Sequence, residues 1–134
     1  MRVPLPSLRA LPFLALASPL ACTPGMGDTP SVRILAPADG ASLCGADVDV
    51  ALEVEGLALV DPTTDGGQGT GHVDVMLNGQ DALMAGAEAF TLHGVEVGAW
   101  QLKVELSNAD HTPVEPYAGD FVYIDVLPAE PCAR

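Results

Sequence analysis

Two histidines and an aspartate are spaced so that they could bind a metal ion. His72 and Asp74 lie two positions apart in an alternating segment, so both side chains point to one face of a strand. His111 follows Asp110 in a turn-forming run, and a loop that folds back toward His72 would complete a set of three ligands for copper or zinc. In the alternative interpretation, His72 only begins a strand and His111 holds a turn through a backbone hydrogen bond. No local zinc signature such as H-E-x-x-H decides between the two.

A second candidate for metal binding is the loop at residues 61–71 (DPTTDGGQGTG), which is rich in aspartate and glycine. Its carboxylate and carbonyl oxygens are ligands that Ca²⁺ prefers, but their order does not match an EF-hand. No helix is expected after the loop, so its glycines do not predict a nucleotide site. We interpret the loop as a solvated connection between strands.

Residue patterns typical of enzymes are missing. Beyond residue 21 the serines are Ser31, Ser42 and Ser107, and none lies within G-x-S-x-G. The single Trp and two Tyr are too few for the aromatic sugar platforms that accompany paired catalytic carboxylates. We therefore expect that the protein is not an enzyme.

Alternation of apolar and polar residues predicts the strands that would position these side chains. The clearest segments are residues 48–54, 72–78, 100–107 and 121–126. Shorter candidates are 32–36 and 87–93, and residues 81–87 could form one helical turn. Turn signals lie at 37–40, 61–71, 78–79 and 94–98.

Short strands with one apolar face cannot bury that face alone. Packing two sheets against each other solves this, so about seven such strands predict an all-β chain folded as an antiparallel sandwich of immunoglobulin or fibronectin III type. Trp100 is expected to be the largest contributor to the core, at about 2 to 3 kcal/mol if fully buried.

The first 21 residues have the features of an export signal: Arg2 and Arg9, a short apolar run, and small residues at the end. Two cleavage sites compete. Ala15-Leu16-Ala17 fits ordinary signal peptidase and would leave Ser18 as the first residue. Leu20-Ala21-Cys22 resembles a bacterial lipobox, although the usual leucine three places before the cysteine is replaced by Pro19. We favour lipidation of Cys22.

The three cysteines support that interpretation. A lipid on Cys22 leaves Cys44 and Cys132, which an oxidising compartment would pair as a disulfide. This bridge would close most of the domain into one loop, a constraint worth about 4 to 5 kcal/mol in the chain-entropy model. A metal-binding thiol pair is the weaker alternative, because no C-x-x-C spacing is present.

The chain is strongly acidic, with 18 Asp and Glu against 5 Lys and Arg. Residues 1–21 hold two of the basic residues and no acidic one, so their removal lowers the net charge from −13 to −15. Nucleic acid is an unfavourable partner for such a surface. Residues 22–30 (CTPGMGDTP) are typical of a flexible tether, and globular patterning begins at Ser31.

Two segments resemble a group of secreted or lipid-anchored bacterial domains of uncharacterised function. They are residues 69–79 (GTGHVDVMLNG) and 98–116 (GAWQLKVELSNADHTPVEP). His72 matches the first histidine of that family's pattern, and Asp110-His111 match its D-H-x-P motif. Asp74 and Trp100 stand where the pattern has two further histidines. The resemblance implies an immunoglobulin-type sandwich with, at best, a weakened histidine site.

Together these features predict a signal peptide at 1–21, a tether at 22–30 and one immunoglobulin-like domain at 31–134. The expected function is that of a lipid-anchored module of the bacterial cell envelope, facing the periplasm or the cell surface, with a membrane contact through its lipid and an envelope protein as partner. A secreted form is the alternative location. A metal-binding protein that uses His72, Asp74 and His111 is the alternative function.

Overall fold

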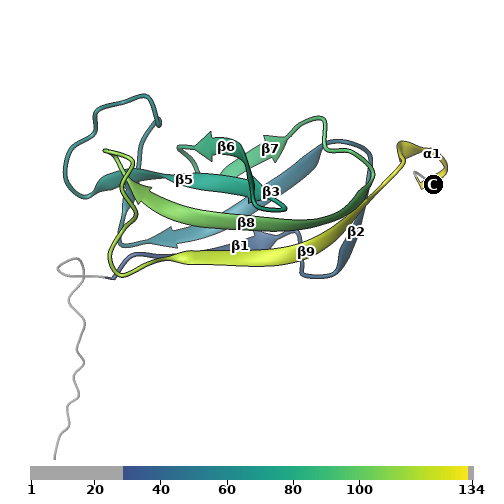
Figure 1. The fold of residues 1–134 in the computed structure, drawn as a ribbon, viewed down its shortest axis with the longest axis horizontal. Coiled ribbons are helices and arrows are strands. Elements are labelled where there is room, and N and C mark those ends of the chain that lie inside the picture. Colours follow the sequence, from purple (N-terminus) through teal and green to yellow (C-terminus); the bar gives the residue numbers. More distant parts are fainter. Residues whose placement is uncertain (1–28, 133–134) are drawn as a thin grey trace, which may run out of the picture.

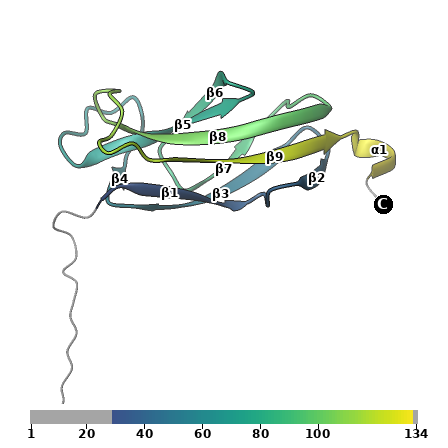
Figure 2. The same cartoon turned by 60° about the horizontal axis from the view of Figure 1, so that its bottom comes forward.

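The computed structural model describes residues 29–132. The expected signal peptide, Cys22 and most of the expected tether lie outside the described residues. From Ser31 the chain forms two stacked layers of strands, as the views in Figures 1 and 2 show. The predicted all-β immunoglobulin-like sandwich is therefore confirmed.

The smaller layer is a three-stranded antiparallel sheet in the order β1-β3-β7. Its strands are β1 (Ser31–Ala36), β3 (Val48–Glu55) and β7 (Ala89–Leu92). The larger sheet runs β2-β9-β8-β5-β4, and β6 also pairs with β5. Its strands are β2 (Ala41–Cys44), β4 (Ala58–Leu59), β5 (Thr70–Leu77), β6 (Gln80–Ala85), β8 (Gly98–Asn108) and β9 (Gly119–Leu127). The pairs β2–β9 and β4–β5 are parallel, so the sandwich is antiparallel except at these two short strands.

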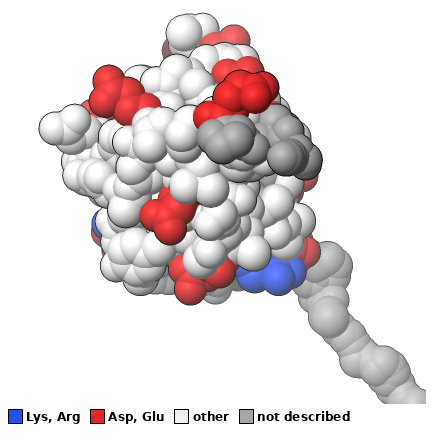
Figure 3. Space-filling view, turned by 90° about the vertical axis from the view of Figure 1, so that its right-hand side faces the viewer, with Lys and Arg blue, Asp and Glu red and all other residues white. Residues whose placement is uncertain are grey.

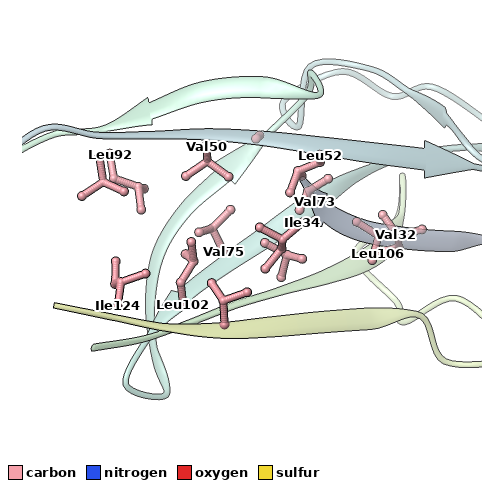
Figure 4. Close-up of a cluster of buried hydrophobic side chains, with 14 of the residues drawn as sticks. Val32, Ile34, Val50, Leu52, Val73, Val75, Leu92, Leu102, Leu106 and Ile124 are labelled. Carbon is pink, nitrogen blue, oxygen red and sulfur yellow. The ribbon is translucent and has the colours of Figure 1, made fainter. Parts of the chain in front are cut away.

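The core lies between the two sheets and is built from the alternating apolar residues. In Figure 4, Val50, Leu52 and Leu92 of the smaller sheet point toward Val75, Leu102 and Ile124 of the larger one. These side chains are buried because every second residue of each strand faces the opposite sheet. The strand faces predicted from sequence for 48–54, 72–78, 100–107 and 121–126 are the ones observed.

Trp100 does not make the central contribution to the core that its size suggests. It is only partly buried near the start of β8, where its indole nitrogen donates a hydrogen bond to the carbonyl of Glu96 (2.8 Å). The largest fully buried side chains are Leu102 and Leu106, further along the same strand. The sequence-based expectation for Trp100 was wrong because the first residues of β8 lie toward the end of the sandwich, where less of the opposite sheet covers them.

The prediction that residues 81–87 could form a helical turn is also wrong, because residues 80–85 form strand β6. Asn78 and Gly79 both have positive φ angles, 51° and 83°, and connect β5 to β6 as a two-residue hairpin. This turn matches the twist of the two strands that flank it. Five of the six residues of β6 are exposed, so the strand lacks the alternating pattern by which strands are recognised.

Cys44 and Cys132 form the disulfide that the cysteine count predicts, with their Cα atoms 5.6 Å apart. Cys44 is the last residue of β2, and Cys132 ends the single helical turn α1 (Ala129–Cys132), which follows β9. The bridge therefore fastens the C-terminal turn to an edge strand. In the part of the chain described here, no helix is long and apolar enough to span a membrane.

Exposed acidic residues come from many of the strands and connections in the described part of the chain. Figure 3 looks at the end of the sandwich that carries α1, where separate acidic side chains lie among uncharged surface. The basic side chains in the described range are Arg33 and Lys103, and each pairs with a glutamate, Glu53 and Glu105 respectively. Their charges are locally neutralised, and the acidic excess is left uncompensated.

Candidate functional site

The structure brings His72, Asp74 and His111 together at one end of the larger sheet. His72 and Asp74 lie on β5 with their side chains on its outer face, opposite to Val73 and Val75 of the core. His111 lies in the connection from β8 to β9, and its ring centroid is 4.9 Å from that of His72, with the ring planes tilted by 55°. The loop that carries His111 thus folds back toward β5.

Hydrogen bonds within the turn at residues 108–113 hold His111 in place. The backbone nitrogen of His111 donates to the carbonyl of Asn108 (2.8 Å), and Asp110 Oδ1 accepts from the hydroxyl (2.6 Å) and backbone nitrogen (3.1 Å) of Thr112. These bonds lower the pKa of the Asp110 carboxyl. His111 has a φ of 70°, which is uncommon for a residue other than glycine. The backbone and Asp110 hold this turn, and the imidazole of His111 itself is exposed.

His72 is the unusual member of the group because its imidazole is buried without a hydrogen bond. Its exposed fraction is 1%, and within residues 29–132 neither ring nitrogen has a hydrogen-bond partner. Nε2 lies 3.2 Å from Asp74 Oδ1, close enough for an ion pair but not aligned as a hydrogen bond. Asp74 Oδ2 accepts a hydrogen bond from the hydroxyl of Ser107 (2.6 Å). Ser107 is the residue of β8 that pairs with His72 of β5. A buried polar group in this condition calls for an explanation.

These side chains do not form a ready three-ligand site. In the described residues, no group of three or more His, Cys, Asp or Glu side chains is arranged to hold a metal ion. His72 and Asp74 are fixed by β5, whereas the exposed ring of His111 can change rotamer, as exposed side chains do within nanoseconds. A metal ion that contacts both histidines would require this change of rotamer.

A cavity of about 400 Å³ adjoins the group, lined by Asp74, Asp81, Ala82, Leu83, Met84 and His111. Met84 faces Asp74 directly across the β5–β6 hairpin and is 50% exposed. Sequence reasoning missed this methionine because it placed residues 81–87 in a helical turn. The Asn78-Gly79 turn was the signal that could have placed Met84 beside Asp74.

The third histidine, His93, and the aspartate-rich loop at residues 61–71 do not join this group. His93 follows β7 in the other sheet, is 75% exposed and pairs with Asp47 (3.1 Å). In the loop considered for Ca²⁺, Asp61 accepts hydrogen bonds from the hydroxyl and then the backbone nitrogen of Thr63, and these bonds lower the pKa of its carboxyl. Asp61 therefore caps a local turn, in agreement with a structural connection between strands.

Comparison with known proteins defines the class of fold. No protein-family model and no curated protein sequence matches the chain. Among solved structures, the fibronectin(III)-like modules of Clostridium thermocellum CbhA are similar, with a TM-score of 0.53 and 15% identity over 73% of this chain and 96% of that chain. The PKD domain of human KIAA0319 has a TM-score of 0.43 and 16% identity over 83% and 94% of the two chains. The likeness to the fibronectin(III)-like modules shows that the chain has a β-sandwich fold of this type, and at 15% identity it concerns the fold alone.

Proposed function

We propose that this chain is an exported module of the bacterial cell envelope, anchored by a lipid on Cys22 and without catalytic activity. The Cys44–Cys132 disulfide is the observation that carries the proposal. Disulfides persist in oxidising compartments outside the cytosol, which agrees with the export signal expected at residues 1–21. The bridge uses two of the three cysteines in the sequence, and the third, Cys22, stands at a position that suits lipidation.

A role in protein contacts is supported by the outer face of the larger sheet. Tyr117, Phe121 and Tyr123 are exposed on this face, and the rings of Phe121 and Tyr123 pack edge to face with centroids 5.6 Å apart. Aromatic residues are enriched in protein interfaces, where their large rings carry much of the binding energy. An envelope protein is therefore the partner that this face suits best.

Membrane partition of a cysteine variant tests the anchor. Cys22→Ser removes the lipidated side chain, so the protein should move from the membrane fraction to the soluble exported fraction. The matched control replaces Cys44 and Cys132 by Ser together, which removes cysteines but leaves the anchor. An unchanged membrane fraction for Cys22→Ser would refute the anchor.

A second candidate function, metal binding, is favoured by a specific observation. His72 and His111 are distant in sequence, yet their rings lie 4.9 Å apart beside Asp74. Imidazole nitrogens are frequent ligands of copper and zinc, and an acidic surface attracts cations. This function is tested by titrating the protein and its His111→Asn variant with copper and with zinc. If neither metal binds, metal binding is refuted.

A further inference from the structure

The buried imidazole of His72 indicates that the site takes a ligand. An unpaired buried polar group is costly because it has lost its hydrogen bonds to water, so native proteins usually satisfy it. Nε2 of His72 lies 3.2 Å from Oδ1 of Asp74, and Asp74 lines the adjoining cavity. A metal ion bound at this nitrogen would satisfy it.

The side chains around the cavity are of the kind that soft metals prefer. The imidazole of His111 and the thioether of Met84 line the cavity, and the ring of His72 packs against that of His111. Imidazole binds copper and zinc alike, but a thioether selects monovalent copper. Zn²⁺ is bound by nitrogen, oxygen or thiolate ligands, and a thioether is not among them.

The charge of the cavity also suits a cation. Asp74 and Asp81 contribute carboxylates, and the lining includes no Lys or Arg. Asp74 Oδ2 is engaged by Ser107, which fixes the carboxylate beside His72. In this position Asp74 offsets the charge of a bound ion without having to act as a ligand.

We infer that the ion bound here is monovalent copper, held by His72, His111 and Met84, with Asp74 as the neighbouring counter-charge. This inference rests on the metal-binding function proposed above and names its metal. Binding requires a new rotamer of the exposed His111 ring, whereas His72 stays in place. In Figure 1 the start of β5 and the end of β8 lie at the end of the sandwich where the chain enters β1, so the site is at that end of the domain.

The test is a competition titration of Cu(I), kept reduced with ascorbate under anaerobic conditions, against a chromophoric Cu(I) chelator. The protein is the full chain with Cys22→Ser, which removes the free thiol and leaves the disulfide. We expect one Cu(I) per chain. His111→Asn and Met84→Leu should each weaken Cu(I) binding by about tenfold or more, since even outer-shell changes at metal sites cost 10–100-fold. Asn tolerates the positive φ of residue 111, and Leu fits the exposed strand position, so both variants should fold.

Matched controls use the same substitutions elsewhere. His93→Asn, in the other sheet, and Met76→Leu, on the far side of Asp74 from His72, should leave Cu(I) affinity unchanged. Binding that survives Met84→Leu, or is lost with Met76→Leu, would overturn the assignment of Met84. A protein that binds Zn²⁺ but not Cu(I) would overturn this inference and leave metal binding standing. If neither ion binds, both the inference and the metal-binding function fail, and the envelope module is unaffected.

Discussion

The ring of His111 lies against the ring of His72, with centroids 4.9 Å apart. His72 is on strand β5, whereas His111 lies in the turn after β8, far away in the sequence. The contact exists because β8 pairs with β5 from Gly71↔Asn108 onward, so the turn after β8 begins beside the start of β5. Its geometry follows from strand register and from the hydrogen bonds of Asn108 and Asp110. On β5, the core residues Val73 and Val75 therefore alternate with the site residues His72 and Asp74, on opposite faces of the same strand.

Removal of the disulfide should lower stability without changing the fold. Replacing Cys44 and Cys132 by Ala together releases a loop that spans a sequence separation of 88 residues. We expect the free energy of unfolding to fall by about 2 to 5 kcal/mol, as measured by urea denaturation of the Cys22→Ser protein and of the same protein without the bridge. A change below about 0.5 kcal/mol would show that the bridge contributes little to this domain.

Truncation of Leu102 and of Leu35 should have different costs, although both residues are leucines in strands. Leu102 is completely buried, so Leu102→Ala should cost about 2 to 5 kcal/mol from lost burial and the cavity left behind. Leu35 is half exposed on the outer side of β1, and Leu35→Ala is the matched control, with an expected cost below about 1 kcal/mol. Equal losses for the two variants, measured by thermal unfolding, would contradict the observed position of the core.

The Asn78-Gly79 hairpin should be sensitive to a single methyl group. Gly79 has a φ of 83°, and Gly79→Ala places a Cβ in a left-handed conformation at a cost of about 1 to 2 kcal/mol. Gln80→Ala, at the next and exposed position, should change the free energy of unfolding by less than about 0.5 kcal/mol. If residues 81–87 formed a helical turn instead, Gly79→Ala would be no more harmful than Gln80→Ala.

Tyr117 should titrate above the ordinary tyrosine value of 10.0. Partial burial and then the hydrogen bond from its hydroxyl to Glu105 (2.9 Å) raise the pKa of Tyr117, because both disfavour the phenolate. Since the folded-state pKa is the higher one, this group stabilises the fold below about pH 10 and loses that contribution as the pH rises through the folded-state value.

Ultraviolet absorbance of the phenolate measures this titration. The chain has two tyrosines, so Tyr123→Phe leaves Tyr117 as the only one that absorbs. Adding Glu105→Gln removes the carboxylate and should lower the midpoint toward the ordinary value. A midpoint at or below that value in the Tyr123→Phe protein would contradict the contact between Tyr117 and Glu105.

The strands that face the core could be predicted from sequence because their burial has a local signature. Val48, Val50 and Leu52 alternate with exposed residues, and the same holds for the apolar residues of β5, β8 and β9. Strand β6 has no such signature, because it is an edge strand whose side chains are mostly exposed. The Asn78-Gly79 dipeptide was the local sign of a hairpin there. Its turn sets β6 beside β5 although the residues of β6 do not alternate between apolar and polar.

The candidate site could be predicted in part. The shared face of His72 and Asp74 follows from the two-residue period of a strand. The approach of His111 depends on the pairing of β5 with β8, which no local pattern reveals. The sequence argument missed Met84, because residues 81–87 were expected to form a helical turn, whereas the position of Met84 opposite Asp74 depends on the pairing of β6 with β5.

The mass and first residue of the mature protein test the central claim, export with a lipid anchor, most directly. Mass spectrometry of protein extracted from membranes should find Cys22 as the first residue, with a mass increased by a diacylglycerol group and further by an acyl chain if the amine is modified. A mature protein that begins at Ser18 and carries no lipid, or one that retains residues 1–21, would contradict the account.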